Sequence, residues 1–303
     1  MKPAVEFIAC QYQYPDGPLI QLGDQRVAPG EIVVVAGPSG SGKSTLLKLL
    51  RGELAPTHGE AKVQGQRVGT RAERLLLDDQ TVGWVPQGED LQSMLRAEEN
   101  VRFHIIGWDE EKRDNRVAHL LEMIGLAGRG KSKTSELSGG ERQRLAIAKA
   151  LAHNPALLLM DEVTNQMDLM TKSKIVMDVK RILKEENRAG IFVLHDPADI
   201  QLLADTLWMM DSGALVQHGT PNEVLSQPVN HRVAGVFERV NALKEAPDLP
   251  GDWRFDGEAY WIWARCLPDL SGTAAVLREQ LVMPNQTVEH WEYRGHVIMR
   301  VYA

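Results

Sequence analysis

The sequence has few of the features that mark secreted, membrane-spanning or nucleic-acid-binding proteins. Its two cysteines, Cys10 and Cys266, stand far apart, so we expect neither a disulfide framework nor a metal-ligand cluster. No apolar run approaches the roughly 18 residues that a membrane-spanning helix requires. Residues 1–10 include Glu6 and no long apolar core, which argues against a secretory signal. These absences predict a reduced, cytoplasmic protein.

Basic residues are also in deficit. The 303 residues include 34 Lys and Arg against 41 Asp and Glu, a formal net charge of −7. Proteins that bind phosphate backbones usually have a basic excess, so no nucleic-acid partner is expected. With 43% hydrophobic and 25% charged residues, the composition is typical of a folded globular protein. The length allows one large domain, or one domain and a smaller companion.

Aromatic residues are scarce, at 6%, and unevenly distributed: nine of the seventeen lie in residues 237–303. Two prolines and a glycine interrupt regular structure in residues 246–252. We therefore expect a main domain over residues 1–232, a linker over 233–252 and a small accessory or regulatory domain over 253–303.

The main domain alternates apolar runs with helical segments. The run 31–36 is followed by a glycine-rich turn and a helical stretch at 45–50, and the runs 156–160 and 190–194 each follow a helical segment. Continuous apolar strands between helices predict an α/β fold with a largely parallel sheet covered on both faces.

The small domain reads differently. Strand-like segments flank Asp256-Gly257 and Arg294-Gly295, and residues 274–281 have a helical pattern. The expected order is two strands, a helix and two strands, which is a small α+β unit.

Residues 37–44 read Gly-Pro-Ser-Gly-Ser-Gly-Lys-Ser and fit the pattern G-x-x-x-x-G-K-[ST] between a strand and a helix. Small residues let successive backbone N–H groups surround an anion at the positive end of the helix dipole. Lys43 can then reach the β- and γ-phosphates of a nucleotide, and the Ser44 hydroxyl can ligate Mg²⁺. The alternative, an ordinary glycine-rich turn, is disfavoured by the strand before it and the helix after it.

An acidic segment follows the apolar run 156–160 and is the second candidate element of a nucleotide site. Asp161 at a strand end can lie beside Mg²⁺, and Glu162 can orient or deprotonate a water for attack on the γ-phosphate. Alone, this pattern also fits a strand end with solvated acids. Next to a phosphate-binding motif it is the expected partner.

Residues 137–144, Leu-Ser-Gly-Gly-Glu-Arg-Gln-Arg, open a helix over 141–152. Ser138, Gly139 and Gly140 form a second anion site at a helix N-terminus. This string resembles the signature motif of ATP-binding cassette (ABC) ATPases, and it lies between the two Walker-type motifs, as that family requires. The resemblance covers residues 1–232. It implies a P-loop NTPase core of ABC type with a helical subdomain at about residues 88–140.

Further positions resemble the family one by one. Tyr14 lies where these ATPases place an aromatic ring that stacks on adenine, and Tyr12 is the competing candidate. Gln87 resembles the glutamine that touches Mg²⁺ and relays the state of the partner subunit. His195 resembles the switch histidine that contacts the γ-phosphate.

The resemblance thus implies ATP and Mg²⁺ as cofactors and a defined set of residues. The expected catalytic residues are Glu162, His195, Lys43 and Gln87, and the expected Mg²⁺ ligands are Ser44, Gln87 and Asp161. The expected nucleotide contacts are Tyr14, Gly37, Pro38, Ser39, Gly40, Ser41, Gly42, Lys43, Ser44, Thr45, Ser138, Gly139, Gly140 and Asp168.

One segment departs from the family. Where the family usually reads Pro, Ser, Ala and Leu, this chain has Val163, Asn165, Gln166 and Met167. In the family that loop lies between two cassettes, so these four replacements are expected to alter communication between the two nucleotide sites. Loss of hydrolysis does not follow, because Glu162 is present.

The resemblance also implies partners. ATP on residues 37–45 of one copy would be covered by residues 138–140 of a second cassette, most simply in a homodimer. The segment between Gln87 and Ser138 resembles the subdomain that grips a membrane permease, which predicts a peripheral location on the inner face of the membrane. Import with a periplasmic or extracellular solute-binding protein is the favoured reading. The alternatives are an exporter ATPase, a non-hydrolysing regulatory subunit, and a soluble ABC ATPase acting on nucleic acid or ribosomes.

Overall fold

The computed structural model describes residues 2–69, 81–88, 90–161, 169–237, 240–243, 249, 251, 253–256, 259–263, 275–283, 286–293 and 296–302. The chain divides into two compact units: Met1–Ala36 with Gly40–Pro221, and Asn222–Ala303 with Gly37–Ser39. Among the described residues, no helix is both long enough and apolar enough to cross a bilayer.

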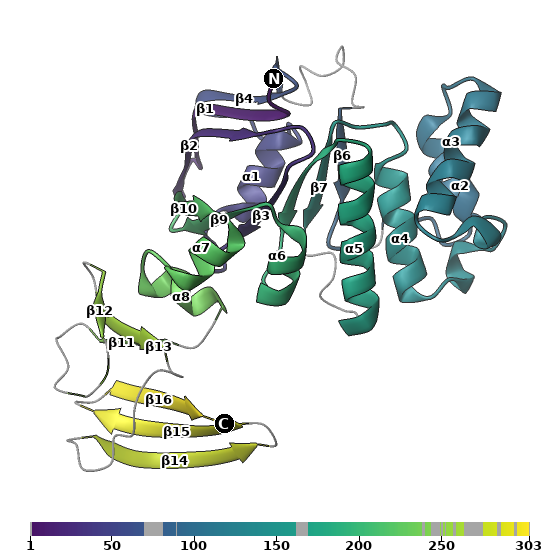
Figure 1. The fold of residues 1–303 in the computed structure, drawn as a ribbon. Coiled ribbons are helices and arrows are strands. Elements are labelled where there is room, and N and C mark those ends of the chain that lie inside the picture. The colour runs from purple at the N-terminus through teal and green to yellow at the C-terminus, as the bar shows by residue number, and fades with distance from the viewer. Residues whose placement is uncertain are drawn as a thin grey trace. The chain divides into compact units, whose positions relative to one another are not determined.

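The first unit is built on a ten-stranded sheet with the order β5-β4-β1-β2-β10-β9-β3-β8-β7-β6 (Figure 1). Its strands are β1 Val5–Gln13, β2 Leu19–Val27, β3 Ile32–Ala36, β4 His58–Val63, β5 Gln66–Arg67, β6 Val82–Val85, β7 Leu157–Asp161, β8 Ala189–Val193, β9 Thr206–Asp211 and β10 Ala214–Gly219. Strands β9, β3, β8, β7 and β6 form a continuous parallel half, whereas β1 pairs antiparallel with both β2 and β4.

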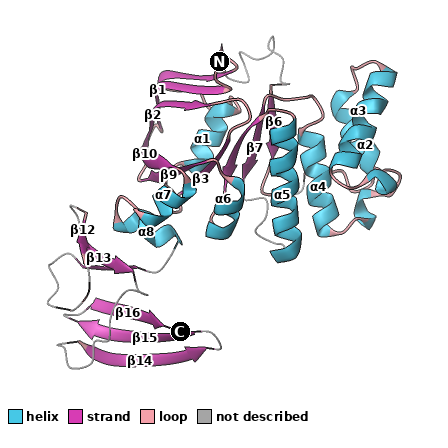
Figure 2. Cartoon of the chain, in the orientation of Figure 1, coloured by secondary structure: helices cyan, strands magenta, loops and turns pink. Residues whose placement is uncertain are grey.

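Helices cover both faces of the parallel half (Figure 2). The α-helices between residues 43 and 203 are α1 Lys43–Leu50, α2 Ala97–Arg102, α3 Glu110–Met123, α4 Gly139–Ala150, α5 Leu169–Glu185 and α6 Pro197–Leu203. Of these, α2 and α3 pack against each other and against α4. Alternate residues of β8 divide between the faces: Ile191 packs with Leu47 of α1, and Phe192 with Val179 of α5. Because every residue of β3 and β8 is buried, these strands are continuously apolar, as the sequence predicts.

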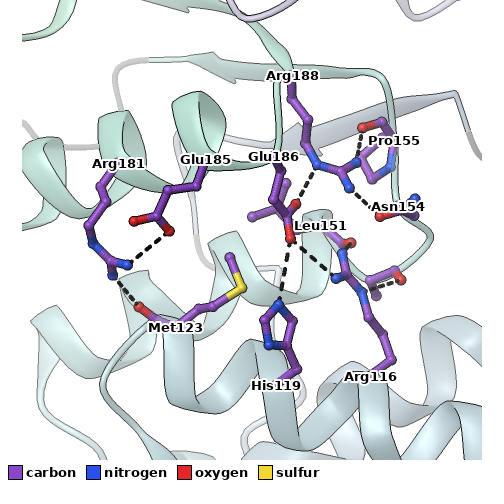
Figure 3. A network of polar contacts seen from close by, with 11 residues as sticks. Arg116, His119, Met123, Leu151, Asn154, Pro155, Arg181, Glu185, Glu186 and Arg188 are labelled. Carbon is purple, nitrogen blue, oxygen red and sulfur yellow. Dashed lines mark hydrogen bonds and ion pairs between the residues drawn. The ribbon is translucent and has the colours of Figure 1, made fainter.

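A polar network fastens α3 to the ends of α4 and α5 (Figure 3). Arg116 donates to the carbonyl of Leu151 at 2.8 Å and lies 3.5 Å from Glu186. Arg188 donates to Glu186, to the Pro155 carbonyl and to Asn154. Burial favours the neutral acid at Glu186, but the charges of Arg188 and Arg116 hold its pKa below the ordinary value.

The second unit contains α8 His231–Phe237, β11 Val240–Leu243, β12 Arg254–Phe255, β13 Tyr260–Trp263, β14 Val276–Met283, β15 Gln286–Tyr293 and β16 His296–Tyr302, while α7 Pro221–Ser226 begins at the division. The strands form two sheets, β11-β13-β12 and β14-β15-β16. The predicted hairpins around Asp256-Gly257 and Arg294-Gly295 are confirmed, because β12 pairs with β13 and β15 with β16. A small core forms around Ile262, Trp291 and Ile298.

The predicted helix at 274–281 is wrong. These residues belong largely to β14, which pairs antiparallel with β15 from Val276 to Met283. Leu277, Leu281 and Met283 also fit a two-residue period, and pairing with the strongly strand-forming β15 selects that period over the helical one. Among the described residues after 252, all regular secondary structure is β-strand.

Candidate functional site

Four neighbouring parallel strands end level with one another at one edge of the sheet. Val193 of β8 lies opposite Val35 of β3 on one side and opposite Asp161 of β7 on the other. Met160 of β7 in turn lies opposite Val85 of β6. Since neighbouring strands are about 4.8 Å apart, the four strand ends fall within roughly 15 Å.

This level edge brings together predicted residues from four separate segments. Gly37, His195 and Gln87 each come two residues after a paired residue of β3, β8 and β6, and Asp161 is the last residue of β7. His195 and Asp161 are half-buried, and Gln87 is exposed. A ligand at this edge therefore meets all four segments. Glu162, Asp168 and residues 163–167 lie outside the described residues.

The phosphate loop, residues 37–45, has the backbone of an anion site. Gly40 has φ +79° and Gly42 has φ +105°, in the left-handed region that favours glycine. Gly42 is the N-cap of α1 and, as a glycine, has no side chain to cap the first turn, so the helix N-terminus faces the loop without a side-chain cap from this position. A Cβ at Gly42 would lie 2.9 Å from Cδ1 of Ile20. Glycine is thus required there by both conformation and space.

The loop side chains suit a phosphate and a hard cation. Lys43 is 7% exposed, although it carries a long charged side chain. The Ser41 hydroxyl is buried and has no hydrogen-bond partner among the described residues. Ser44 is exposed at the start of α1. An uncapped helix end and an orphaned buried hydroxyl beside a lysine together fit a nucleotide phosphate.

Tyr14 lies beside this loop. Its hydroxyl is 3.0 Å from Oγ1 of Thr45. Tyr12 packs edge-on against it, with ring centroids 4.8 Å apart. The side chain of Gln13 donates to the carbonyls of Tyr14 and Gly17, both at 2.8 Å, and so fixes the turn. Of the two tyrosines considered from the sequence, Tyr14 is thus the one linked to the loop by a hydrogen bond.

Oxygen atoms are the donors available for a cation. Among the described residues, no three His, Cys, Asp or Glu side chains gather into a metal site. The hydroxyl of Ser44, the amide of Gln87 and the carboxylate of Asp161 are hard oxygen donors, which suit Mg²⁺ when phosphate oxygens complete its shell.

The signature segment, residues 137–144, begins α4 with a reciprocal cap. Ser138 Oγ accepts from the N–H of Glu141 at 3.2 Å, and the Ser138 N–H donates to Oε2 of Glu141 at 2.8 Å. That backbone hydrogen bond, with help from Arg129, holds the pKa of Glu141 below its ordinary value. Helix α4 packs on α2, α3, α5 and β6, none of which carries the phosphate loop.

One cluster at the site was not predicted from the sequence. Lys172 of α5 lies 3.1 Å from Asp196, which follows His195 in the chain, and 2.5 Å from Asp199. The available signal was an acid directly after His195 and another three residues on, but a lysine 24 residues upstream gives no indication that it reaches them.

Comparisons with known proteins point in one direction. A family model described as "ABC transporter" matches residues 24–165. The sulfate/thiosulfate import ATP-binding protein of Gloeobacter violaceus is 36% identical over 228 residues, covering 74% of this chain and 64% of that protein. The energy-coupling factor transporter ATP-binding protein of Methanothermobacter thermautotrophicus is 38% identical over 227 residues, covering 73% of this chain and 72% of that protein.

A solved structure gives the same result. CbiO1 from Clostridium perfringens, described as part of the ABC transporter complex CbiONQ, aligns with a TM-score of 0.70 at 26% identity. The alignment covers 75% of this chain and 92% of that chain. The chain spans less than two thirds of the length of the sulfate/thiosulfate relative.

Proposed function

Since this chain belongs to the ABC transporter family of ATP-binding proteins, we propose that it is the ATP-hydrolysing subunit of a transporter, with closure of an ATP-bound cassette dimer driving solute movement. The observation that carries the proposal is the level edge of β3, β8, β7 and β6, where the phosphate loop, His195, Asp161 and Gln87 follow adjacent strands. The binding energy of the nucleotide would drive the movement of an attached partner protein.

In this proposal each segment has a role. The N–H groups of the phosphate loop and Lys43 hold the β- and γ-phosphates, and Tyr14 supports the adenine. Ser44, Gln87 and Asp161 would hold Mg²⁺, which neutralises charge on the transferred phosphoryl group. Glu162 activates the water and His195 contacts the γ-phosphate.

A second cassette completes the site. Ser138, Gly139 and Gly140 lie at the N-terminus of α4, which packs mainly on α2, α3, α5 and β6, whereas the phosphate loop precedes α1. In this proposal the N–H groups of Gly139 and Gly140 and the hydroxyl of Ser138 would face the nucleotide of another copy, and Asp168 would contribute at the same interface. We propose a homodimer with two nucleotides between the copies.

A permease is the proposed membrane partner. Met94 is 78% exposed, Phe103 51% and Ile106 65%, and all three belong to the predicted helical subdomain at 88–140. Large apolar side chains left in water on one segment are typical of a protein-binding surface. Docking there would hold the chain at the inner face of the membrane. Import is favoured because relatives with this cassette are named for import, and import would add an extracytoplasmic solute-binding protein.

The first experiment is affinity purification of the tagged protein from detergent-solubilised membranes of its host, followed by mass spectrometry. A polytopic permease at stoichiometric level is the expected result, and its identity would narrow the solute. A preparation free of membrane proteins would refute the transporter role and favour a soluble ABC ATPase.

The chemistry is tested by Glu162→Gln. We expect turnover to fall by about 10²- to 10⁴-fold, the usual contribution of a general base, while ATP binding is retained. Phosphate release and fluorescent-nucleotide titration measure the two properties separately. Hydrolysis at the wild-type rate would exclude Glu162 as the base.

A further inference from the structure

A buried ion cluster joins α5 to α6 beside His195. Lys172 of α5 is 9% exposed, and its Nζ lies 2.5 Å from Oδ2 of Asp199 and 3.1 Å from Oδ2 of Asp196. Asp199 is also buried, at 5% exposed. Two carboxylates on one turn of α6 thus share one ammonium group from a different helix.

The α6 end of this cluster controls the turn that holds His195. Asp196 follows His195 directly and is the N-cap of α6, where its Oδ1 accepts from the N–H of Ala198 at 2.9 Å. Pro197 at the first helical position further restricts the backbone of Asp196. The exit of the chain from β8, and with it the direction of the His195 side chain, is therefore tied to the position of Asp196.

The α5 end of the cluster lies close in sequence to the proposed catalytic base. Helix α5 begins at Leu169, and Lys172 is in its first turn, ten residues after Glu162. A single side chain consequently links the helix that follows the acidic segment with the turn that carries the switch histidine.

The charges in the cluster are mutually dependent. Burial alone would lower the pKa of Lys172, but its close contacts with the carboxylates of Asp199 and Asp196 raise it above the ordinary value. Burial favours the neutral form of Asp196, yet the ammonium group and the Ala198 N–H lower its pKa. The charged forms of Lys172 and Asp196 therefore stabilise each other, and loss of the lysine would leave the buried Asp199 without its ion-pair partner Lys172.

We propose that Lys172 is a positioning residue that ties the turn carrying His195 to α5, by anchoring Asp196 and Asp199. This inference rests on the proposed ATPase function. Lys172 would act through these two aspartates rather than on the nucleotide itself. Its role is to keep the turn after β8 in the orientation that hydrolysis requires.

The test compares Lys172→Met with the matched control Lys180→Met. Lys180 also joins α5 to α6, since its Nζ donates to the carbonyl of Leu202 at 2.7 Å, but it lies at the far end of α6 from His195. We expect Lys172→Met to lower kcat by about ten- to a hundredfold, as a small misplacement of a catalytic group does, with ATP affinity unchanged. Lys180→Met should leave kcat within twofold, and Lys172→Arg should restore most of the activity.

Two further readouts separate positioning from general damage. In a His195→Ala background, Lys172→Met should cause no further loss of the residual rate, because both changes act through one side chain. In protein labelled with ¹³C at histidine, the His195 ring signal, assigned by its absence in His195→Ala, should move in Lys172→Met and stay in place in Lys180→Met. If Lys172→Met does not fold, the pair Lys172→Met with Asp199→Leu removes both buried charges and is measured instead.

An equal loss of rate with and without His195 would overturn the inference, and so would an unmoved His195 signal. Failure of the proposed function looks different. In that case the wild-type protein itself would not hydrolyse ATP, while the histidine spectrum would still report whether Lys172 positions the ring.

Discussion

The level edge of β3, β8, β7 and β6, where we propose that phosphate binds, and the N-terminal end of α4 are held in place in different ways. At the edge, backbone pairing of β3, β8, β7 and β6 sets which residues are level, and the side chains that follow inherit their positions. At α4, side chains do this work: Ser138 and Glu141 cap the helix start, and the Arg116–Glu186–Arg188 network fixes its end (Figure 3).

The difference indicates where each region tolerates change. A ladder of backbone hydrogen bonds survives most single substitutions, so the edge should fail mainly where a side chain contacts ligand or where glycine is required. A side-chain network depends on each member, since a buried charge left without its partner is costly. The first region should therefore lose function before stability, and the second stability before function.

Lys43→Ala should have the largest effect and spare the fold. Removing the ammonium group takes away a charge that pairs with phosphate, so we expect ATP affinity to fall about a hundredfold, near 3 kcal/mol. A fluorescent-nucleotide titration measures this, with Lys48→Ala, an exposed lysine of the same helix, as control. Unchanged affinity would mean that residues 37–45 are not the phosphate site.

Glu186→Gln should lower the stability of the fold and leave ATP binding intact. It leaves the guanidinium groups of Arg116 and Arg188 without their shared carboxylate, and hydrogen bonds to charged groups contribute about 1.5–3 kcal/mol. We expect a loss of that size in the free energy of unfolding by urea, with ATP affinity unchanged. The exposed Glu185→Gln, whose partner Arg181 is also exposed, is the control and should lose under about 0.5 kcal/mol. Equal losses in the two variants would break the comparison.

The parts predicted from the sequence are those that local pattern determines. The apolar runs became β3, β7 and β8, and the Gly-rich motif became the loop before α1, because burial on both faces and positive φ at Gly42 each permit few residue types. The family and its fold were likewise predicted and are confirmed by the comparisons. The domain limits and the site roles remain predictions.

What the sequence did not reveal depends on distant partners. Residues 276–283 satisfy both a helical and a strand period, and only pairing with β15 selects the strand. Lys172 is a charged residue in a helix like many others until the fold places it against Asp196 and Asp199. No local sequence pattern indicates which strand or which charged residue will be the partner when that partner is distant in the sequence.

Gly42→Ala tests a position where the backbone of the phosphate loop favours glycine. At φ +105° an alanine is strained, and its Cβ would meet Ile20. Holding an L-residue in the left-handed region costs about 1–2 kcal/mol, and the loop can avoid part of it by giving up the geometry that binds phosphate. We expect a loss of stability of that size together with weaker ATP binding. Gly128→Ala, where a Cβ meets nothing within 4 Å, is the control for chemical denaturation.

The smallest expected effect concerns acid and the cap of α4. Because the N–H of Ser138 holds the pKa of Glu141 below its ordinary 4.5, the ionised carboxylate stabilises the folded state fully above that value. The contribution is lost as the pH falls through the lower folded pKa. The free energy of unfolding of the wild type should therefore exceed that of Glu141→Gln by about 0.5–1.5 kcal/mol at pH 7, and this difference should disappear on acidification. Urea unfolding of both proteins between pH 7 and 3 measures it, with the exposed Glu122→Gln in α3 as control. A gap that stays constant with pH would show that the cap does not depend on the charge of Glu141, and the contrast with the backbone-held edge would then rest on the Arg116–Glu186–Arg188 network alone.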